Sequence, residues 1–87
     1  MSEERVARIE SILTESFAPD YLLVKDQSHL HAGHAGARDG RGHFDVTIVS
    51  MAFAGKRPLE RHRMVYEALG SLMDTDIHAI KINATSP

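Results

Sequence analysis

Apolar residues recur at helical spacing in the first part of the chain. Four of them would lie on one face of a helix: Val6, Ile9, Ile12 and Leu13. Ser2 can cap this segment, and two glutamates follow it, where the helix dipole favours negative charge. The pattern predicts a helix over about residues 2–16. Pro19 ends it, because proline disfavours the helical conformation in the residue before it.

Three later segments have the composition or the alternation of strands. Residues 21–26 are rich in strand-forming side chains. Residues 43–49 alternate cleanly between apolar and polar positions, and residues 77–83 alternate as well before a short tail, ATSP. The apolar face of the second segment is made by Phe44, Val46 and Ile48.

The pattern turns helical again between the second and third predicted strands. Residues 51–58 contain Gly55 and are interpreted as a turn, with Pro58 near the start of the helix. The helix is expected to end near Asp74. Its apolar side would be formed by Met64, Val65, Leu69, Leu72 and Met73.

This element order, α-β-β-α-β, predicts a two-layer α+β fold with a three-stranded mixed sheet. The first two strands are expected to be antiparallel, and the last two parallel, because a helix joins them by a crossover. Both helices must cover the same apolar sheet face, since no other predicted element can bury it. The 87 residues are enough for a single domain, residues 1–87.

Composition narrows the class of protein. The net charge of −2 gives no general attraction for nucleic acid or anionic membrane. The charged opening segment lacks the apolar core of a signal peptide, and no apolar run approaches the length of a bilayer span. No catalytic set of Ser, His and Asp or paired acids stands out. We therefore expect a cytoplasmic protein that is not an enzyme and has no membrane association.

Histidine is the unusual component of the chain. There is no cysteine, and three of the six histidines fall within residues 27–42, a stretch without apolar periodicity that we interpret as a long loop: His29, His31 and His34. Three neutral imidazoles could bind zinc, nickel or copper, or the loop could simply be polar and solvated. His78 would share the face of Ile80 and Ile82 in the last strand, either as a partly buried histidine or as a ligand on a rigid element.

Basic residues gather before and within the first turns of the second helix. They oppose the helix dipole there, which suggests phosphate or nucleic-acid binding. A solvated basic turn balanced by Glu60 and Glu67 is the alternative. The residues concerned are Lys56, Arg57, Arg61, His62 and Arg63.

Several motifs in one order resemble the BolA family and together cover nearly the whole chain. The first is D-x-S followed by a loop histidine, from Asp26 to His31. An H-F pair and the pattern V-S-x-x-F-x-G follow in residues 43–55. The segment PLERHRMVY at 58–66 is the most distinctive, and I-H-A at 77–79 stands where the family has V-H-A-L.

The resemblance implies an α-β-β-α-α-β fold similar to the type II KH arrangement, with a short helical turn before the long helix near Pro58. It also implies a heterodimer with a monothiol glutaredoxin that shares a [2Fe–2S] cluster, with a role in iron–sulfur trafficking, iron homeostasis or redox regulation. In such a heterodimer the partner's cysteine and the sulfur of glutathione are ligands. The isolated chain would hold no cluster stably.

The remaining ligands implied by the resemblance are histidines. His78 matches the histidine of the last strand, and the loop ligand must be histidine because the chain has no cysteine. His31 aligns best by its distance from Asp26, but the loop is longer than the commonest form and His34 could substitute. The competing role attached to the family is that of a DNA-binding transcriptional regulator, which would use the basic segment 56–63.

Overall fold

The computed structural model describes residues 2–28 and 42–87. Within them the chain forms helices and strands in the predicted order, with two short helical elements, η3 and α3, in addition. The elements are α1 (Ser2–Phe17), β1 (Tyr21–Asp26), β2 (Gly42–Val49), the 3-10 helix η3 (Met51–Phe53), α2 (Pro58–Leu69), α3 (Leu72–Thr75) and β3 (Ile77–Thr85).

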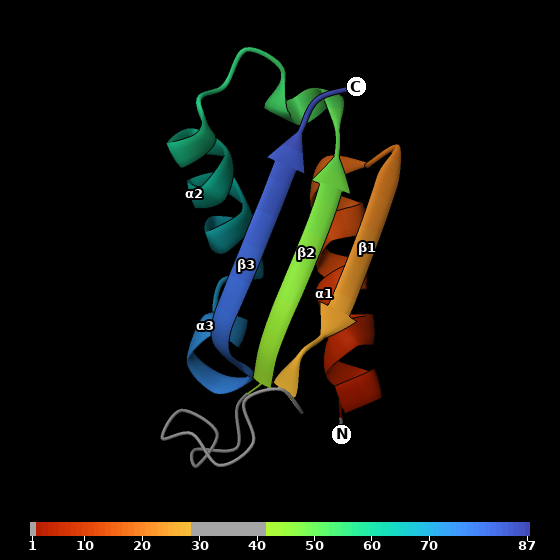
Figure 1. Ribbon diagram of the computed structural model, residues 1–87, viewed down its shortest axis with the longest axis vertical. Coiled ribbons are helices and arrows are strands. Elements are labelled where there is room, and N and C mark those ends of the chain that lie inside the picture. Colours follow the sequence, from red (N-terminus) through yellow and green to blue (C-terminus); the bar gives the residue numbers. More distant parts are fainter. Residues whose placement is uncertain (1, 29–41) are drawn as a thin grey trace.

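The three strands form one mixed sheet in the order β1-β2-β3. β1 and β2 are antiparallel and β2 and β3 are parallel, which confirms both predictions. Figure 1 shows α1 and α2 on the same side of the sheet, so the described elements leave the other face open.

The core lies between this sheet and the two helices. Ile9 and Leu13 of α1 have no exposed surface, and neither has Val65 of α2. They pack on the apolar face of β2 that its alternation predicts, because alternate side chains of a strand point to the same side. The strand residues of the core are Val24, Phe44, Val46, Ile48, Ile77, Ile82 and Ala84.

The second helix is shorter than its apolar pattern predicts. α2 ends at Leu69 rather than near residue 74, because Gly70 has a φ of 53°, which glycine adopts at low cost. The chain then makes a separate helical turn, α3, from Leu72 to Thr75. A short helical turn, η3, also precedes α2, as the resemblance to the family implies. The turn expected near Pro58 is wrong in place: η3 ends at Phe53, and Pro58 is the first residue of α2.

The last strand is longer than predicted. β3 continues to Thr85, so half of the supposed tail belongs to the sheet. Ala84 is buried opposite Ile48, and the backbone N–H of Ser50 donates to the carbonyl of Thr85 over 2.9 Å. A small side chain in the core gives little alternation signal, which explains why the sequence pattern ends this strand too early.

Candidate metal-binding site

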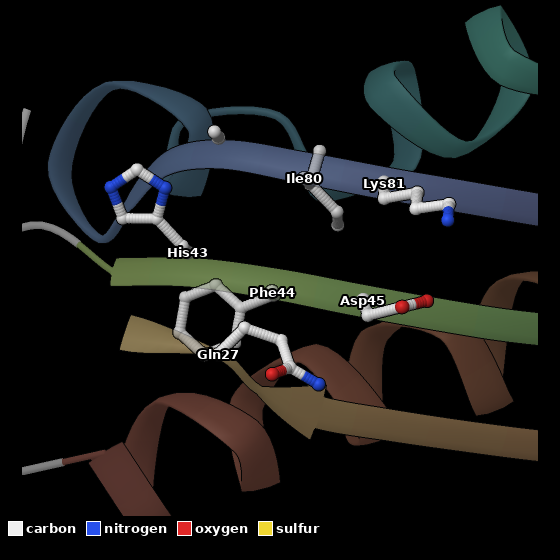
Figure 2. Close-up of a pocket in the computed structure, with 7 residues that line it drawn as sticks. Gln27, His43, Phe44, Asp45, Ile80 and Lys81 are labelled. Atoms are coloured by element: carbon white, nitrogen blue, oxygen red, sulfur yellow. The ribbon is translucent and has the colours of Figure 1, made fainter. Parts of the chain in front are cut away.

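Two histidines on neighbouring strands meet at one end of the sheet. His43 is the second residue of β2 and His78 the second residue of β3. Their ring centroids are 5.1 Å apart and the ring planes are inclined by 51°. His43 is half-buried and His78 is exposed. Figure 2 shows the His43 ring extending from β2 toward β3.

A shift in strand register accounts for the orientation of His78. Gly42 pairs with Ile77 and His43 pairs with Ala79, so His78 is an extra residue on β3 between two paired positions. Such bulges turn a side chain away from the regular alternation. The prediction that His78 shares the face of Ile80 and Ile82 is therefore wrong, because its ring lies beside that of His43, which points away from the face of buried Phe44.

The start of β2 is fastened to the end of β1. The backbone N–H of Gln27 donates to the carbonyl of His43 over 2.7 Å, and the N–H of His43 donates to Oγ of Ser28 over 3.1 Å. Ser28 is itself held, because its N–H donates to Oδ1 of Asp26 over 2.8 Å. The D-x-S motif thus fixes the backbone beside His43.

Close packing around position 42 requires glycine there. A Cβ atom at this position would lie 2.6 Å from the ring of Phe44 and 3.0 Å from Oγ of Ser28. Only glycine fits without displacing one of these groups. Its backbone N–H donates to the carbonyl of Asp76 over 2.9 Å, which joins the starts of the two histidine-bearing strands.

Asp76 anchors the start of β3 through charge. Its Oδ2 atom lies 2.8 Å from Nη1 of Arg8 and 3.5 Å from Nε of Arg5, both in α1. The hydroxyl of Thr75 donates to Oδ1 over 2.6 Å. This hydrogen bond, and then the charges of Arg8 and Arg5, lower the pKa of Asp76 below its ordinary value despite partial burial. The carboxylate that precedes His78 by two residues is therefore ionised and fixed.

A cleft of about 530 Å³ lies beside His43. Ala79 is opposite His43 in the strand register, and its small side chain leaves space next to the imidazole. Figure 2 shows the side chains around this cleft. They belong to Gln27, His43, Phe44, Asp45, Ala79, Ile80 and Lys81.

Only one of the predicted metal ligands lies within the described residues. His78 is described, whereas His29, His31 and His34 lie outside the described residues. Within residues 2–28 and 42–87 no group of three or more His, Cys, Asp or Glu side chains is arranged to hold a metal ion. The sequence reasoning overlooked His43 as a site residue, although its place at the loop end of an alternating strand could have indicated it.

The predicted basic segment is not a single free patch. Arg61 is engaged in the fold: its Nε donates to the carbonyl of Lys56 over 2.9 Å and its Nη1 to that of Ala84 over 3.1 Å. These bonds tie the start of α2 to the end of β3. His62 is half-buried, and the exposed members of the segment are Lys56, Arg57 and Arg63.

No helix in the described part of the chain is long and apolar enough to cross a membrane. A family model described as BolA-like protein matches residues 13–87.

Curated relatives agree with this match. The Arabidopsis thaliana protein "Protein BOLA1, chloroplastic" is 40% identical over 88 residues, which cover 98% of this chain and 55% of that protein. "SufE-like protein 1, chloroplastic/mitochondrial" from the same plant is 41% identical over 95% of this chain and 24% of its own length. The chain thus spans about half or less of these two relatives. "DNA-binding transcriptional regulator BolA" of Escherichia coli is 41% identical over 87% of this chain and 70% of its own length.

Solved structures show the same fold. The BolA domain of SufE1 from Arabidopsis thaliana superposes with a TM-score of 0.85 at 39% identity, covering 95% of this chain and 92% of that one. BolA1 from the same plant gives a TM-score of 0.81 at 35% identity with the same coverage. With a family match over residues 13–87 and these structural neighbours, the chain belongs to the family of BolA-like proteins.

Proposed function

We propose that this BolA-like chain forms a heterodimer with a monothiol glutaredoxin and shares a [2Fe–2S] cluster with it. Its role would then lie in iron–sulfur trafficking, iron homeostasis or redox regulation. The observation that carries the proposal is the exposed imidazole of His78, held beside His43 at the end of the sheet where residues 29–41 leave and rejoin it.

The donor atoms of the chain suit one part of such a site. With no cysteine, this chain can offer only nitrogen and oxygen ligands. Two histidines replace two cysteines on one iron in Rieske-type [2Fe–2S] centres, and the reduction potential rises as a result. His78 would supply one nitrogen and His31 or His34 the other. The cysteine of glutaredoxin and the sulfur of glutathione would supply the rest, so the isolated chain would not retain a cluster.

The surroundings of His78 favour a ligand role for it. An exposed side chain is accessible to a partner, and its backbone is held by the bond between Gly42 and Asp76 and by the ion pairs of Asp76. A ligand on a rigid element keeps its position better than one on a loop. The site would thus combine a fixed imidazole with one from residues 29–41.

The test is anaerobic reconstitution of the chain with a monothiol glutaredoxin, glutathione, iron and sulfide. We expect one [2Fe–2S] cluster per heterodimer, with visible absorption and circular dichroism that differ from those of glutaredoxin alone. His78→Ala should change these spectra and shorten the lifetime of the cluster. Of the single changes His31→Ala and His34→Ala, one should have a similar effect.

His62→Ala is the matched control, because this half-buried histidine lies on α2 and not beside His43. It should leave the mixed cluster unchanged. Unaltered spectra for both His78→Ala and the double change His31→Ala/His34→Ala would refute the ligand assignment. Failure to form any heterodimer with the unmodified chain would refute the function itself.

DNA binding is a second candidate, supported by the name of the Escherichia coli relative and by three exposed basic residues. So few phosphate contacts would give weak binding that falls steeply with salt. Combined Lys56→Ala, Arg57→Ala and Arg63→Ala changes should abolish any mobility shift. Arg61→Ala is a poorer probe, since it also removes two bonds of the fold. Absence of a shift at low salt with the unmodified chain would exclude this function.

A further inference from the structure

We propose that His43 and His78 together form a binding site for a single divalent transition-metal ion. The chain would bind this ion without a partner protein. Copper(II) is the preferred ion, because it binds nitrogen ligands most tightly among the first-row divalent metals. The site goes beyond the proposed cluster function. It shares His78 with the cluster site but requires neither a cluster nor a glutaredoxin.

The distance between the rings suits such a site. When two imidazoles bind one ion through nitrogens about 2.0–2.1 Å away, their centroids lie roughly 4.5–5 Å apart, depending on the angle at the metal. The centroids of His43 and His78 are 5.1 Å apart before any ion is present. The two rings are therefore already at about the separation that two ligands of one ion require.

The strands fix this arrangement on both sides. His43 is held at its N–H by Ser28 and at its carbonyl by Gln27. His78 follows Ile77, which is fully buried, and stands out of the regular alternation because of the bulge. Rigid placement of both imidazoles lowers the entropy lost when a metal binds.

There is also room for the other ligands of the ion. His78 is exposed, and the cleft beside His43 opens where Ala79 has only a methyl group. Water can complete the coordination from this side. Because no third protein ligand stands in the described residues, we expect binding of moderate strength, reversed by a chelator.

The experiment must separate this pair from the histidines of residues 29–41. The background is therefore the triple variant His29→Ala/His31→Ala/His34→Ala, which keeps three of the six histidines. Copper(II) alone is titrated into it and followed by calorimetry and electron paramagnetic resonance. We expect one ion per chain, with a nitrogen-coordinated signal.

Removing either imidazole should weaken this binding. His43→Phe and His78→Phe, each made in the background, should lower the affinity at least about tenfold, since even outer-shell partners of a metal are commonly worth that much. Phe keeps an aromatic ring in contact with the remaining histidine. His62→Phe is the matched control and should change the affinity less than about twofold.

A second measurement does not depend on the folding of any variant at these positions. In the background protein, substoichiometric copper(II) should broaden the ring resonances of His43 and His78 and spare those of His62. Loss of all binding in the background, or equal broadening of all three rings, would overturn the proposal. Neither outcome bears on the cluster, which is tested only with glutaredoxin present.

Discussion

The two ends of the sheet differ in the burial of their side chains: one end is held by buried groups, and the other leaves His78 exposed. At the end of β2 that leads into η3, Ser50 is buried and its hydroxyl donates to the carbonyl of Phe17 over 2.7 Å and accepts from the N–H of Ala52 over 3.1 Å. The ring of Phe53 packs against that of Phe17 with centroids 5.0 Å apart. Arg61 completes this end by bonding the carbonyl of Ala84.

The opposite end is also fastened, but the bonds there hold backbone and leave side chains accessible. The backbone of Gly42 and His43 is held by hydrogen bonds to Gln27, Ser28 and Asp76. His78 is exposed at a bulge. Figure 1 shows the two ends separated by the full length of β2. One end thus contributes to stability through buried groups, and the other presents imidazoles on a fixed backbone.

Phe53→Ala should have the largest effect on stability. The side chain is fully buried, so we expect a loss of about 3–5 kcal/mol in the free energy of unfolding. Urea denaturation measures it. Met51→Ala, two residues earlier and 68% exposed, is the control and should cost less than about 0.5 kcal/mol. Similar losses for both variants would mean that buried side chains do not stabilise this end of the sheet.

Ser50→Ala should come next, at about 1–3 kcal/mol, because the change leaves the partly buried carbonyl of Phe17 and the N–H of Ala52 without their shared partner. The comparison is with Ser71→Ala, whose serine is exposed and makes no side-chain cap bond to α3. An equal effect of the two substitutions in thermal unfolding would contradict the role given to Ser50.

Asp76→Asn tests the fastening of the histidine end. We expect a loss of about 1–2 kcal/mol at neutral pH, since the ion pairs with Arg8 and Arg5 disappear. The folded-state pKa of Asp76 lies below its unfolded value of about 3.9, so its contribution is present above that pH and is lost as pH falls through the folded pKa.

The difference between the unmodified protein and the variant should therefore shrink below about pH 4. Urea midpoints measured from pH 7 to pH 3 would show this convergence. Asp74→Asn, at an exposed position of α3, should give no such dependence. A constant difference across the range would show that the charge of Asp76 is not what anchors β3.

His78→Ala should have the smallest effect on stability, within about 0.5 kcal/mol, because its side chain is exposed. The neighbouring change Ile77→Ala should instead cost about 2–5 kcal/mol. Thermal denaturation of both variants distinguishes an exposed side chain from one that the core needs. A large loss for His78→Ala would remove the contrast between the two ends.

Much of the fold could be predicted from the sequence because its signals are local. The alternation in residues 43–49 corresponds to β2, and the helical spacing of Ile9 and Leu13 corresponds to the buried face of α1. The break at Gly70 was missed because Leu72 and Met73 continue the apolar spacing of α2 although they belong to α3.

The site was less predictable, because it depends on register. Alternation alone places His78 with Ile80 and Ile82, and only the paired strand reveals the bulge that exposes it. The contact with His43 joins residues 35 positions apart, which no local pattern encodes. The resemblance to the BolA family implies a ligand role for His78, which stays a prediction, and its motifs also include Ser28 and Ser50, whose hydrogen bonds hold the fold.

The hydrogen bond between the N–H of His43 and Oγ of Ser28 limits what an insertion between these two residues can change. Since these two residues fix the separation of the points where residues 29–41 leave and rejoin the sheet, insertions between them alter only the closure entropy of the connecting segment. That cost grows slowly, by about 0.6 kcal/mol for each doubling of length. Mutation can therefore lengthen the connection between Ser28 and Gly42 while the strands that carry His43 and His78 keep their register.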